Sequence, residues 1–252
     1  MENSPPQLLP TRFDRLHFVS VGGAAGDMLL AALIDLGADL RTIVDTFESM
    51  QEPGLELHVE RVNVNNEQAC HVRSIAKEHG RHHTHLKDIM ATIDRGTMSD
   101  AARDRAKRIF EILARAEAEV HGGGEEDVHL HEVGELDSIM DVVGIAVALE
   151  TLGNPKCTCS PLSSGKGIVQ TSHGPLQCPV PAVCKVSHRW SVPLVDTDIE
   201  GETITPTGIS ALAQMCSSFT NMETHNASAK GVGAGTRRFV DLPNVLRVFG
   251  WN

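Results

Sequence analysis

Residues 15–37 constrain the fold more than any other stretch, because they join a strand pattern directly to a helix pattern. The segment RLHFVSV (15–21) is short, apolar and rich in β-branched residues, and it ends in glycines, which predicts a buried strand. The segment GGAAGDM then turns the chain into LLAALIDLG, an apolar helix that Gly37 is placed to end. A buried strand followed by an apolar helix favours a layered structure in which helices pack on a sheet.

Strand and helix patterns keep alternating after this unit. The apolar positions of 55–64 change phase at Arg61-Val62, which suggests a β-bulge. The predicted class is α/β or α+β, with layered helices and a mixed sheet. The expected elements are helices at 39–50, 99–121 and 135–152, a hairpin of strands 55–64 and 67–77, a glycine loop at 231–235 and a last strand at 244–251.

The length and apolar content allow one large domain or two small ones. The 252 residues are 41% hydrophobic, which is enough for an extensive core. The composition changes near residue 153, from helix-rich and histidine-rich to strand-rich with more glycine and proline. We therefore divide the chain into a loose arm (1–14), a helix-rich lobe with the histidine cluster (15–153) and a strand-rich lobe (154–252).

Charge and hydropathy exclude several classes of function. The net charge of −11 and the 4% aromatic content argue against a nucleic-acid partner. No apolar run approaches the roughly 18–20 residues of a membrane span, and the N-terminus lacks the pattern of a secretory signal. The six cysteines show no CxxC spacing, so reduced thiols and a cytoplasmic location are expected, with Cys157 and Cys159 as small residues of a buried strand.

Histidine is the unusual residue, because seven of the 13 lie between His79 and His131. In an extended segment His129 and His131 share a face, and on the following helix Asp137 and Asp141 do the same. Two imidazoles with up to three carboxylates, Glu132 included, are a plausible site for a first-row metal ion. A solvated surface, with Asp137 favouring the helix dipole, is the alternative interpretation.

A second group of histidines, His82, His83 and His85, crowds the loop before a helix. Such a tract is typical of metal binding or of a solvent-exposed loop.

Two helix starts offer amides for an anion. Thr205 is placed to cap a helix with Pro206 at its first position, and the amides of Thr207 and Gly208 follow. The glycine turn at Gly26 is similar, although its spacing matches neither GxGxxG nor the P-loop. Asp27 at that helix start would repel a phosphate and would suit a cation or an N-cap.

Six segments, spread through most of the chain, carry a family resemblance. They are GDMLLAALIDLG (26–37), HHTHLKDI (82–89), HLHEVGELDSIMDVVG (129–144), TSHGPLQCPVPA (171–182), ETITPTG (202–208) and GVGAGTRRFVDLPNVLRVF (231–249). Together they resemble the LarC family, the nickel-insertion proteins of nickel-pincer cofactor synthesis. The resemblance implies a lyase-class chelatase that inserts Ni²⁺ into a pyridinium mononucleotide bearing two thiocarboxylates, using CTP hydrolysis with Mg²⁺ or Mn²⁺.

The resemblance also suggests roles for the candidate residues. Histidines 129 and 131 would bind nickel, and the group at 82–85 would capture or transfer it. The three aspartates would be further ligands, or acid–base groups where the pyridinium carbon loses its proton. The predicted sets are His129, His131, Glu132, His82, His83 and His85 for metal, Asp137, Asp141 and Asp27 for catalysis, and Thr205, Thr207, Gly208 and Gly26 for the nucleotide.

The chain departs from the family pattern in three ways, one of which is the less typical sequence of NPKCTCSPLSSGKG (154–167) and CKVSHRWSVP (184–193). Val19 and Ala25 stand where the family usually has an acidic residue and a hydroxyl. The family usually continues into a smaller C-terminal domain to which CTP binding is ascribed, whereas this sequence ends at Asn252. We therefore expect the N-terminal part of a split or truncated enzyme, homo-oligomeric and completed by a separate C-terminal chain. The alternatives are a non-catalytic nickel-binding scaffold and a hydrolase with a metal at His129, His131 and Asp137.

Overall fold

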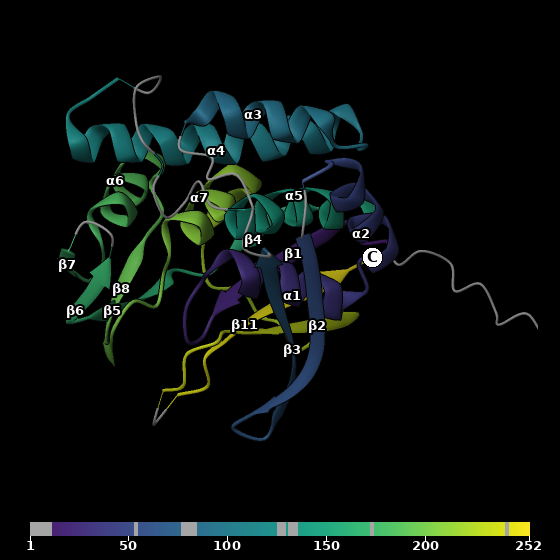
Figure 1. The fold of residues 1–252 in the computed structure, drawn as a ribbon. Helices are drawn as coiled ribbons and strands as arrows, with labels where there is room; N and C mark the ends of the chain where they lie inside the picture. Colours follow the sequence, from purple (N-terminus) through teal and green to yellow (C-terminus); the bar gives the residue numbers. More distant parts are fainter. Residues whose placement is uncertain are drawn as a thin grey trace, which may run out of the picture.

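A computed structural model describes residues 12–52, 55–76, 85–124, 130, 136–171, 174–239 and 242–252. Figure 1 shows a large sheet with helices stacked over one of its faces. The described helices are α1 (Gly26–Leu36), α2 (Leu40–Ser49), α3 (Leu86–Arg95), α4 (Asp100–His121), α5 (Leu136–Thr151), α6 (Pro181–Trp190) and α7 (Pro206–Met215). Helix α1 packs on the sheet, α5 packs on α1, and α4 covers α5, α6 and α7.

Seven of the described strands form one mixed sheet in the order β2-β3-β10-β11-β1-β4-β9. Strand β1 pairs antiparallel with β11 and parallel with β4, so strands from before and after residue 153 share the sheet. The predicted α/β class with layered helices and a mixed sheet is confirmed. The strands are β1 (Arg15–Ser20), β2 (Leu55–Val64), β3 (Glu67–Ala76), β4 (Lys156–Cys159), β5 (Leu162–Lys166), β6 (Ile168–Thr171), β7 (Gly174–Gln177), β8 (Leu194–Glu200), β9 (Cys216–Phe219), β10 (Ala229–Ala234) and β11 (Val245–Trp251).

The unit predicted at 15–37 is the centre of the core. In β1, Leu16 and Phe18 are fully buried, and α1 buries most of its length over the sheet. Gly37 ends α1 with φ 117°, the left-handed conformation that glycine adopts at little cost. The strand and helix expected from this stretch are therefore both confirmed.

The predicted glycine loop at 231–235 is wrong, because these residues mostly belong to β10, inside the sheet. A Cβ atom on Gly231 would lie 2.2 Å from the Ala32 carbonyl oxygen, and one on Gly233 would lie 2.0 Å from that of Met28. The glycines let α1 approach the strand closely, which is one of the reasons for glycine within a strand.

The predicted hairpin is confirmed, with Asn65 and Asn66 both at positive φ in its turn. The expected bulge is wrong, because β2 and β3 pair without a break from Leu55 to Val64. The apolar pattern changes phase because Val59 packs in the main core, whereas Val62 packs in a smaller cluster. Odd- and even-numbered residues of a strand point to opposite faces of the sheet. Val59 and Val62 are therefore buried on opposite faces, and the buried face of β2 changes along its length.

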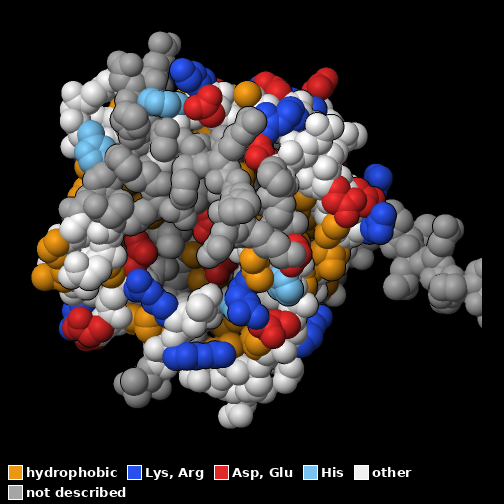
Figure 2. Space-filling model, in the orientation of Figure 1, with side chains coloured by type: hydrophobic (Ala, Val, Ile, Leu, Met, Phe, Trp, Pro, Cys, Tyr) orange, Lys and Arg blue, Asp and Glu red, His pale blue; other side chains and the backbone are white. Residues whose placement is uncertain are grey.

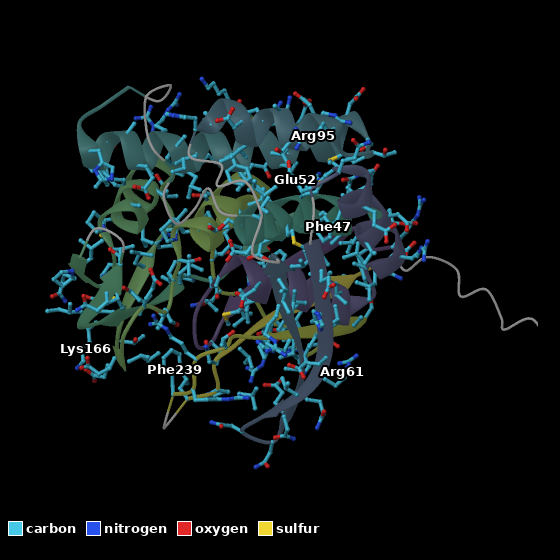
Figure 3. The ribbon with its side chains drawn as sticks, in the orientation of Figure 1. Phe47, Glu52, Arg61, Arg95, Lys166 and Phe239 are labelled. Atoms are coloured by element: carbon cyan, nitrogen blue, oxygen red, sulfur yellow. The ribbon has the colours of Figure 1, made fainter. Side chains whose placement is uncertain are left out.

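Two ion pairs with largely buried carboxylates connect helices to neighbouring segments; Arg95, Glu52 and Arg61 are labelled in Figure 3. Arg95 of α3 pairs with Glu52, which follows α2 and has a side chain only 3% exposed. Arg61 of β2 pairs with Asp35 of α1. Asp35 also accepts a hydrogen bond from the Val232 N–H at 2.7 Å, so it connects α1 to β10.

All six cysteines are free thiols, as predicted, and Cys157 and Cys159 are buried in β4. In the described ranges, no helix combines the length and apolar character that crossing a membrane requires.

Candidate functional site

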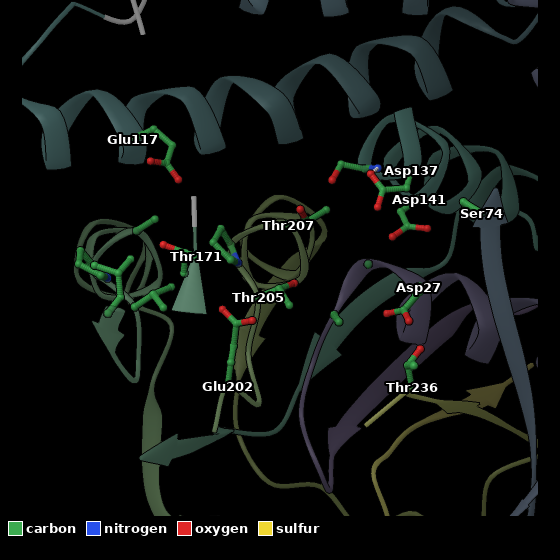
Figure 4. A pocket seen from close by; sticks show the side chains of 18 of the residues that line it. Asp27, Ser74, Glu117, Asp137, Asp141, Thr171, Glu202, Thr205, Thr207 and Thr236 are labelled. Atoms are coloured by element: carbon green, nitrogen blue, oxygen red, sulfur yellow. Dashed lines mark hydrogen bonds between the residues drawn. The ribbon is translucent and has the colours of Figure 1, made fainter. Parts of the chain in front are cut away.

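A cavity of about 550 Å³ opens where the N-terminal ends of α1, α5 and α7 meet. The end of α4, the start of α6 and strand β3 complete its wall. Figure 2 shows acidic side chains around a hollow near the middle of one face, and Figure 4 shows the wall from nearby. The volume is in the range of small-molecule sites, which are commonly about 300–1,000 Å³.

The cavity wall carries more acidic than basic groups. Figure 4 shows Asp137 and Asp141 above Asp27, with Glu117 and Glu202 on the other side. Among the residues placed in this wall, these five carboxylates face two basic side chains, Arg73 and His121. Opposite charges attract, so such a wall suits a cation, a metal ion or a positively charged ring. The polar lining residues are Asp27, Arg73, Ser74, Glu117, His121, Asp137, Ser138, Asp141, Thr171, Glu202, Thr205, Thr207 and Thr236.

The fold brings together most of the described candidate residues from three separate helices. Asp27 and Gly26 come from α1, Asp137 and Asp141 from α5, and Thr205 and Thr207 from the start of α7; all six line the cavity. Gly208 lies behind this wall, where a Cβ atom would be 2.2 Å from the Ala24 carbonyl oxygen. It therefore allows α7 to pack closely against the turn before α1.

The candidate histidines are placed differently. His85 is the N-cap residue of α3, makes no side-chain capping bond and does not line the cavity. His82, His83, His129, His131 and Glu132 lie outside the described residues. Within the ranges that are described, no group of three or more His, Cys, Asp and Glu side chains is arranged to hold a metal ion.

Asp141 is a cavity residue with a strongly raised pKa. Burial raises its pKa well above the ordinary value, and the nearby Asp27 and Asp137 raise it further. Its Oδ1 atom is buried without a hydrogen-bond partner in the described structure. Ser74 lies beside Asp141 and lowers its pKa to a smaller extent. Ser74 Oγ makes no hydrogen bond of good geometry within the described residues. The Asp27 backbone N–H also opposes the shift, so the ionised form is only partly compensated for its burial.

Gly26 explains how Asp141 reaches this position. A Cβ atom on Gly26 would lie 2.6 Å from Asp141 Oδ2, so glycine at the first position of α1 makes room for the carboxyl group. The same holds one turn further along α5, where a Cβ atom on Gly144 would meet Leu30 of α1 at 2.8 Å. The face of α5 that carries Asp141 and Gly144 thus contacts α1.

Asp27 has a pKa raised to about 6, with burial as the largest cause. Its Oδ1 atom accepts a hydrogen bond from the Met28 N–H at 2.8 Å, which lowers the pKa, as does the nearby His71. The negative charge of Asp137 raises the pKa of Asp27. The pKa of Asp137 is itself raised, again chiefly by burial. A carboxyl group with a pKa near neutrality can exchange protons under physiological conditions, which is a property of acid–base groups.

We expect the metal-free protein to lose stability as the pH rises from about 4 to about 6. The folded state holds the Asp27 proton more tightly than the unfolded state, so the contribution is present below the ordinary pKa and is lost through the folded value of about 6. The loss due to this group should be about 2–3 kcal/mol. Urea unfolding of the wild type and of Asp27→Asn at both pH values measures this loss. If the unfolding free energies of the two proteins changed equally with pH, the prediction would be contradicted.

The N-cap of α1 is Ala25, which has extended backbone angles and no side-chain capping bond. Replacing Ala25 by Ser should stabilise the protein by about 1 kcal/mol, because a hydroxyl at this position can accept a bond from a first-turn amide. Urea unfolding of Ala25→Ser and of the similarly sized Ala25→Val measures the effect. Equal midpoints for the two variants would show that capping is not responsible.

Helix α7 is capped as predicted, and the cap limits its anion-binding capacity. Thr205 Oγ1 accepts the Gly208 N–H at 3.1 Å, and Pro206 has no N–H. The Ile209 N–H bonds to the Thr205 carbonyl. The Thr207 amide therefore remains as the first-turn donor for a ligand.

Sequence patterns did not reveal several wall residues. Ser74 and Arg73 belong to a hairpin strand with no distinctive motif, and Glu117 lies on a surface helix. Glu202 does belong to the segment ETITPTG, and its place three residues before Thr205 was the sequence signal that could have indicated a wall residue. Thr236 follows β10, which had been predicted to be a loop.

Comparison with known proteins decides the family. The sequence model described as nickel insertion protein matches residues 16–250. The chain belongs to this nickel insertion protein family. The resemblance to LarC proteins inferred from the six segments is thereby confirmed.

Two relatives have the name pyridinium-3,5-bisthiocarboxylic acid mononucleotide nickel insertion protein. The one from Acetivibrio thermocellus is 37% identical over 231 residues, covering 88% of this chain and 57% of the relative. The one from Staphylococcus epidermidis is 38% identical over 226 residues, covering 90% of this chain and 56% of the relative. The chain thus spans little more than half the length of these relatives. No solved structure shows significant similarity to it.

The two residues that the family resemblance marks as unusual, Ala25 and Val19, lie in different places. Ala25 lines the cavity. Val19 pairs with Arg247 and alternates along β1 with the core residue Phe18, so it faces away from α1 and the cavity. A hydroxyl at position 25, which the family resemblance implies, would lie in the cavity wall, whereas position 19 lies outside it.

Proposed function

We propose that this chain is the nickel-handling part of an enzyme that inserts Ni²⁺ into a pyridinium bisthiocarboxylate mononucleotide in the cytoplasm. The observation that supports this most is the anionic cavity, in which three aspartates with raised pKa values converge from α1 and α5. Both Ni²⁺ and a pyridinium ring are cations, so one acidic wall can attract both. The family membership and the names of the relatives support the same chemistry.

Nickel would reach the cavity through the predicted histidines. His129, His131 and Glu132 directly precede α5 in the chain, and α5 carries Asp137 and Asp141 into the cavity wall. Imidazole nitrogen suits Ni²⁺ well, and a site that delivers its metal must also release it. The group His82, His83 and His85 would capture the ion first.

Asp27 would act as the base when nickel replaces the proton on the pyridinium carbon. Its pKa of about 6 leaves it mostly ionised at neutral pH, yet basic enough to accept a proton. Asp141, whose pKa burial raises well above its ordinary value, would hold its proton until a cation arrives and then exchange the proton for the cation.

The phosphate of the mononucleotide would lie at the start of α7, where a backbone amide is available, although Glu117 and Glu202 lie on the same side of the cavity. The Thr207 amide at the start of α7 and the Thr205 hydroxyl are the donors at this end of the cavity, whereas the Thr171 hydroxyl already donates to the Gly174 carbonyl. Gly26 and Gly208 would contribute by keeping α1 and α7 close together.

Nickel titration by calorimetry tests the metal assignment. The double variant His129→Ala/His131→Ala should bind Ni²⁺ at least about tenfold more weakly than the wild type. His225→Ala is a matched control, because that side chain is 75% exposed and does not line the cavity. Unchanged stoichiometry and affinity in the double variant would refute the assignment.

Reconstitution tests the activity. Sulfurated nucleotide, Ni²⁺, CTP and Mg²⁺ or Mn²⁺ are supplied with and without a separately expressed C-terminal domain from a relative. Product that forms only with this domain indicates a split enzyme, in which CTP acts through the added part. Absence of product in both cases supports the alternative, a nickel-binding scaffold, for which the lost hydroxyl at Ala25 in the cavity wall is the supporting observation.

A further inference from the structure

Three side chains from three elements form a hydrogen-bonded chain that ends at the cavity. His71 Nδ1 lies 3.1 Å from Glu60 Oε1, and His71 Nε2 lies 3.2 Å from Thr236 Oγ1. Thr236 lines the cavity, and Figure 4 shows its hydroxyl directed toward the Asp27 carboxylate. A hydroxyl, an imidazole and a carboxylate in this order and at these distances form the arrangement used to move protons in enzymes.

The pairing of the strands fixes this chain of bonds. His71 lies directly opposite Glu60 in the β2–β3 hairpin and opposite Ala234 of β10 in the sheet. Its neighbours Cys70 and Val72 pack in the main core, so the imidazole lies on the other face of the sheet. Thr236 follows the end of β10, where a side chain can bond to His71 and still face the cavity. This series of hydrogen bonds therefore connects the two faces of the sheet by passing around the end of β10.

The middle and the outer end of this series of hydrogen bonds lie in different environments. His71 is 9% exposed, whereas the Glu60 side chain is 50% exposed and also lies 3.6 Å from Arg73. His71 is close enough to Asp27 to lower the pKa of that carboxyl group. The charged groups around the imidazole are therefore Asp27 from α1, Glu60 from β2, and Arg73 on its own strand.

We propose that Thr236, His71 and Glu60 form a relay that carries the proton released in the cavity to solvent on the other face of the sheet. The inference rests on the proposed function, because nickel–carbon bond formation releases one proton to Asp27. His71 then acts as a positioning residue for proton movement, since it reaches the cavity through Thr236.

Each transfer balances. Neutral His71 donates its Nδ1–H to Glu60 and accepts the Thr236 O–H at Nε2. When protonated Asp27 gives its proton to Thr236 Oγ, directly or through a water molecule, the hydroxyl passes its own proton to Nε2. The imidazolium is held by the Glu60 carboxylate and gives its Nδ1 proton to water at the exposed end. His71 is then neutral with its proton on Nε2. Rotation of the imidazole ring and of the Thr236 hydroxyl restores the first state before the next proton, with no other reactant consumed.

The relay is tested first without turnover, by ¹⁵N NMR of the full chain, which reports the histidine tautomer. We expect neutral His71 to carry its proton on Nδ1, and Glu60→Gln to reduce the fraction of this tautomer. A neutral His71 protonated on Nε2 in the wild type would overturn the proposal, because it could not accept a proton from Thr236.

Turnover of the reconstituted enzyme gives the second test. His71→Gln and Thr236→Val should each lower kcat about 10- to 100-fold and change the pH profile, whereas Thr236→Ser should restore the rate. Glutamine can keep the hydrogen bonds of a merely structural histidine but cannot carry a proton, so wild-type kcat in His71→Gln would refute the relay. Absence of product from the wild type would instead refute the proposed function, and the NMR result would then decide on the relay.

Discussion

Replacing Asp141 by Asn is expected to stabilise the metal-free protein by about 1–3 kcal/mol near neutral pH and to weaken divalent-cation binding about 10- to 100-fold. The carboxyl group is buried, its Oδ1 atom has no partner in the described structure, and Asp27 and Asp137 add repulsion. Asparagine has nearly the same shape and no charge to bury, so the folded state no longer opposes ionisation. The same change removes the group that would bind the cation.

Urea unfolding and Ni²⁺ calorimetry on the same samples separate the two effects. Asp104→Asn is the matched control, because Asp104 is exposed on α4, and its replacement should change stability by no more than about 0.5 kcal/mol. If Asp141→Asn destabilised the metal-free protein, the carboxylate would have to be a structural partner within the fold. Gain of stability with loss of binding is the pattern expected of a functional site.

The parts of the site that sequence patterns predicted are those with local signals. Thr205 before Pro206 marks a helix start in any context, and the i, i+4 spacing places Asp137 and Asp141 on one helix face. Asp27 was recognised by its place at the beginning of a helix. What the sequence could not indicate is that these helix starts meet in one cavity, because that depends on the order of strands in the sheet.

The residues that sequence reasoning missed depend on contacts across that sheet. His71 is adjacent to Glu60 through the register of the predicted hairpin and to Thr236 through the parallel pairing of β3 with β10, and only the second pairing joins segments far apart in the sequence. The β10 pairing was hidden because glycines normally disfavour a strand interior. The reason for glycine there is the proximity of α1, which is a tertiary constraint. Position within the fold therefore overrode local propensity.

The glycines of β10 give the second large effect, which is a loss of stability. Gly233→Ala should destabilise the protein by about 3 kcal/mol, since the added Cβ would lie 2.0 Å from the Met28 carbonyl oxygen and 2.7 Å from the Ala32 backbone nitrogen. These atoms belong to the backbone of α1, which cannot turn aside as a flexible side chain can. The helix must therefore move away from the sheet, or the centre of the sheet must deform.

The position of α1 also decides the geometry of the cavity, because Gly26 and Asp27 begin this helix and contact Asp141 of α5. Gly233→Ala should therefore weaken cation binding even where it remains folded, although Gly233 does not line the cavity. Gly123→Ala is the matched control, because a Cβ atom there meets nothing within 4 Å. Thermal unfolding and calorimetry of the two variants measure both effects. A Gly233→Ala protein as stable as the control would mean that α1 does not rest on β10, and the convergence of carboxylates at its N-terminus would then lose its structural basis.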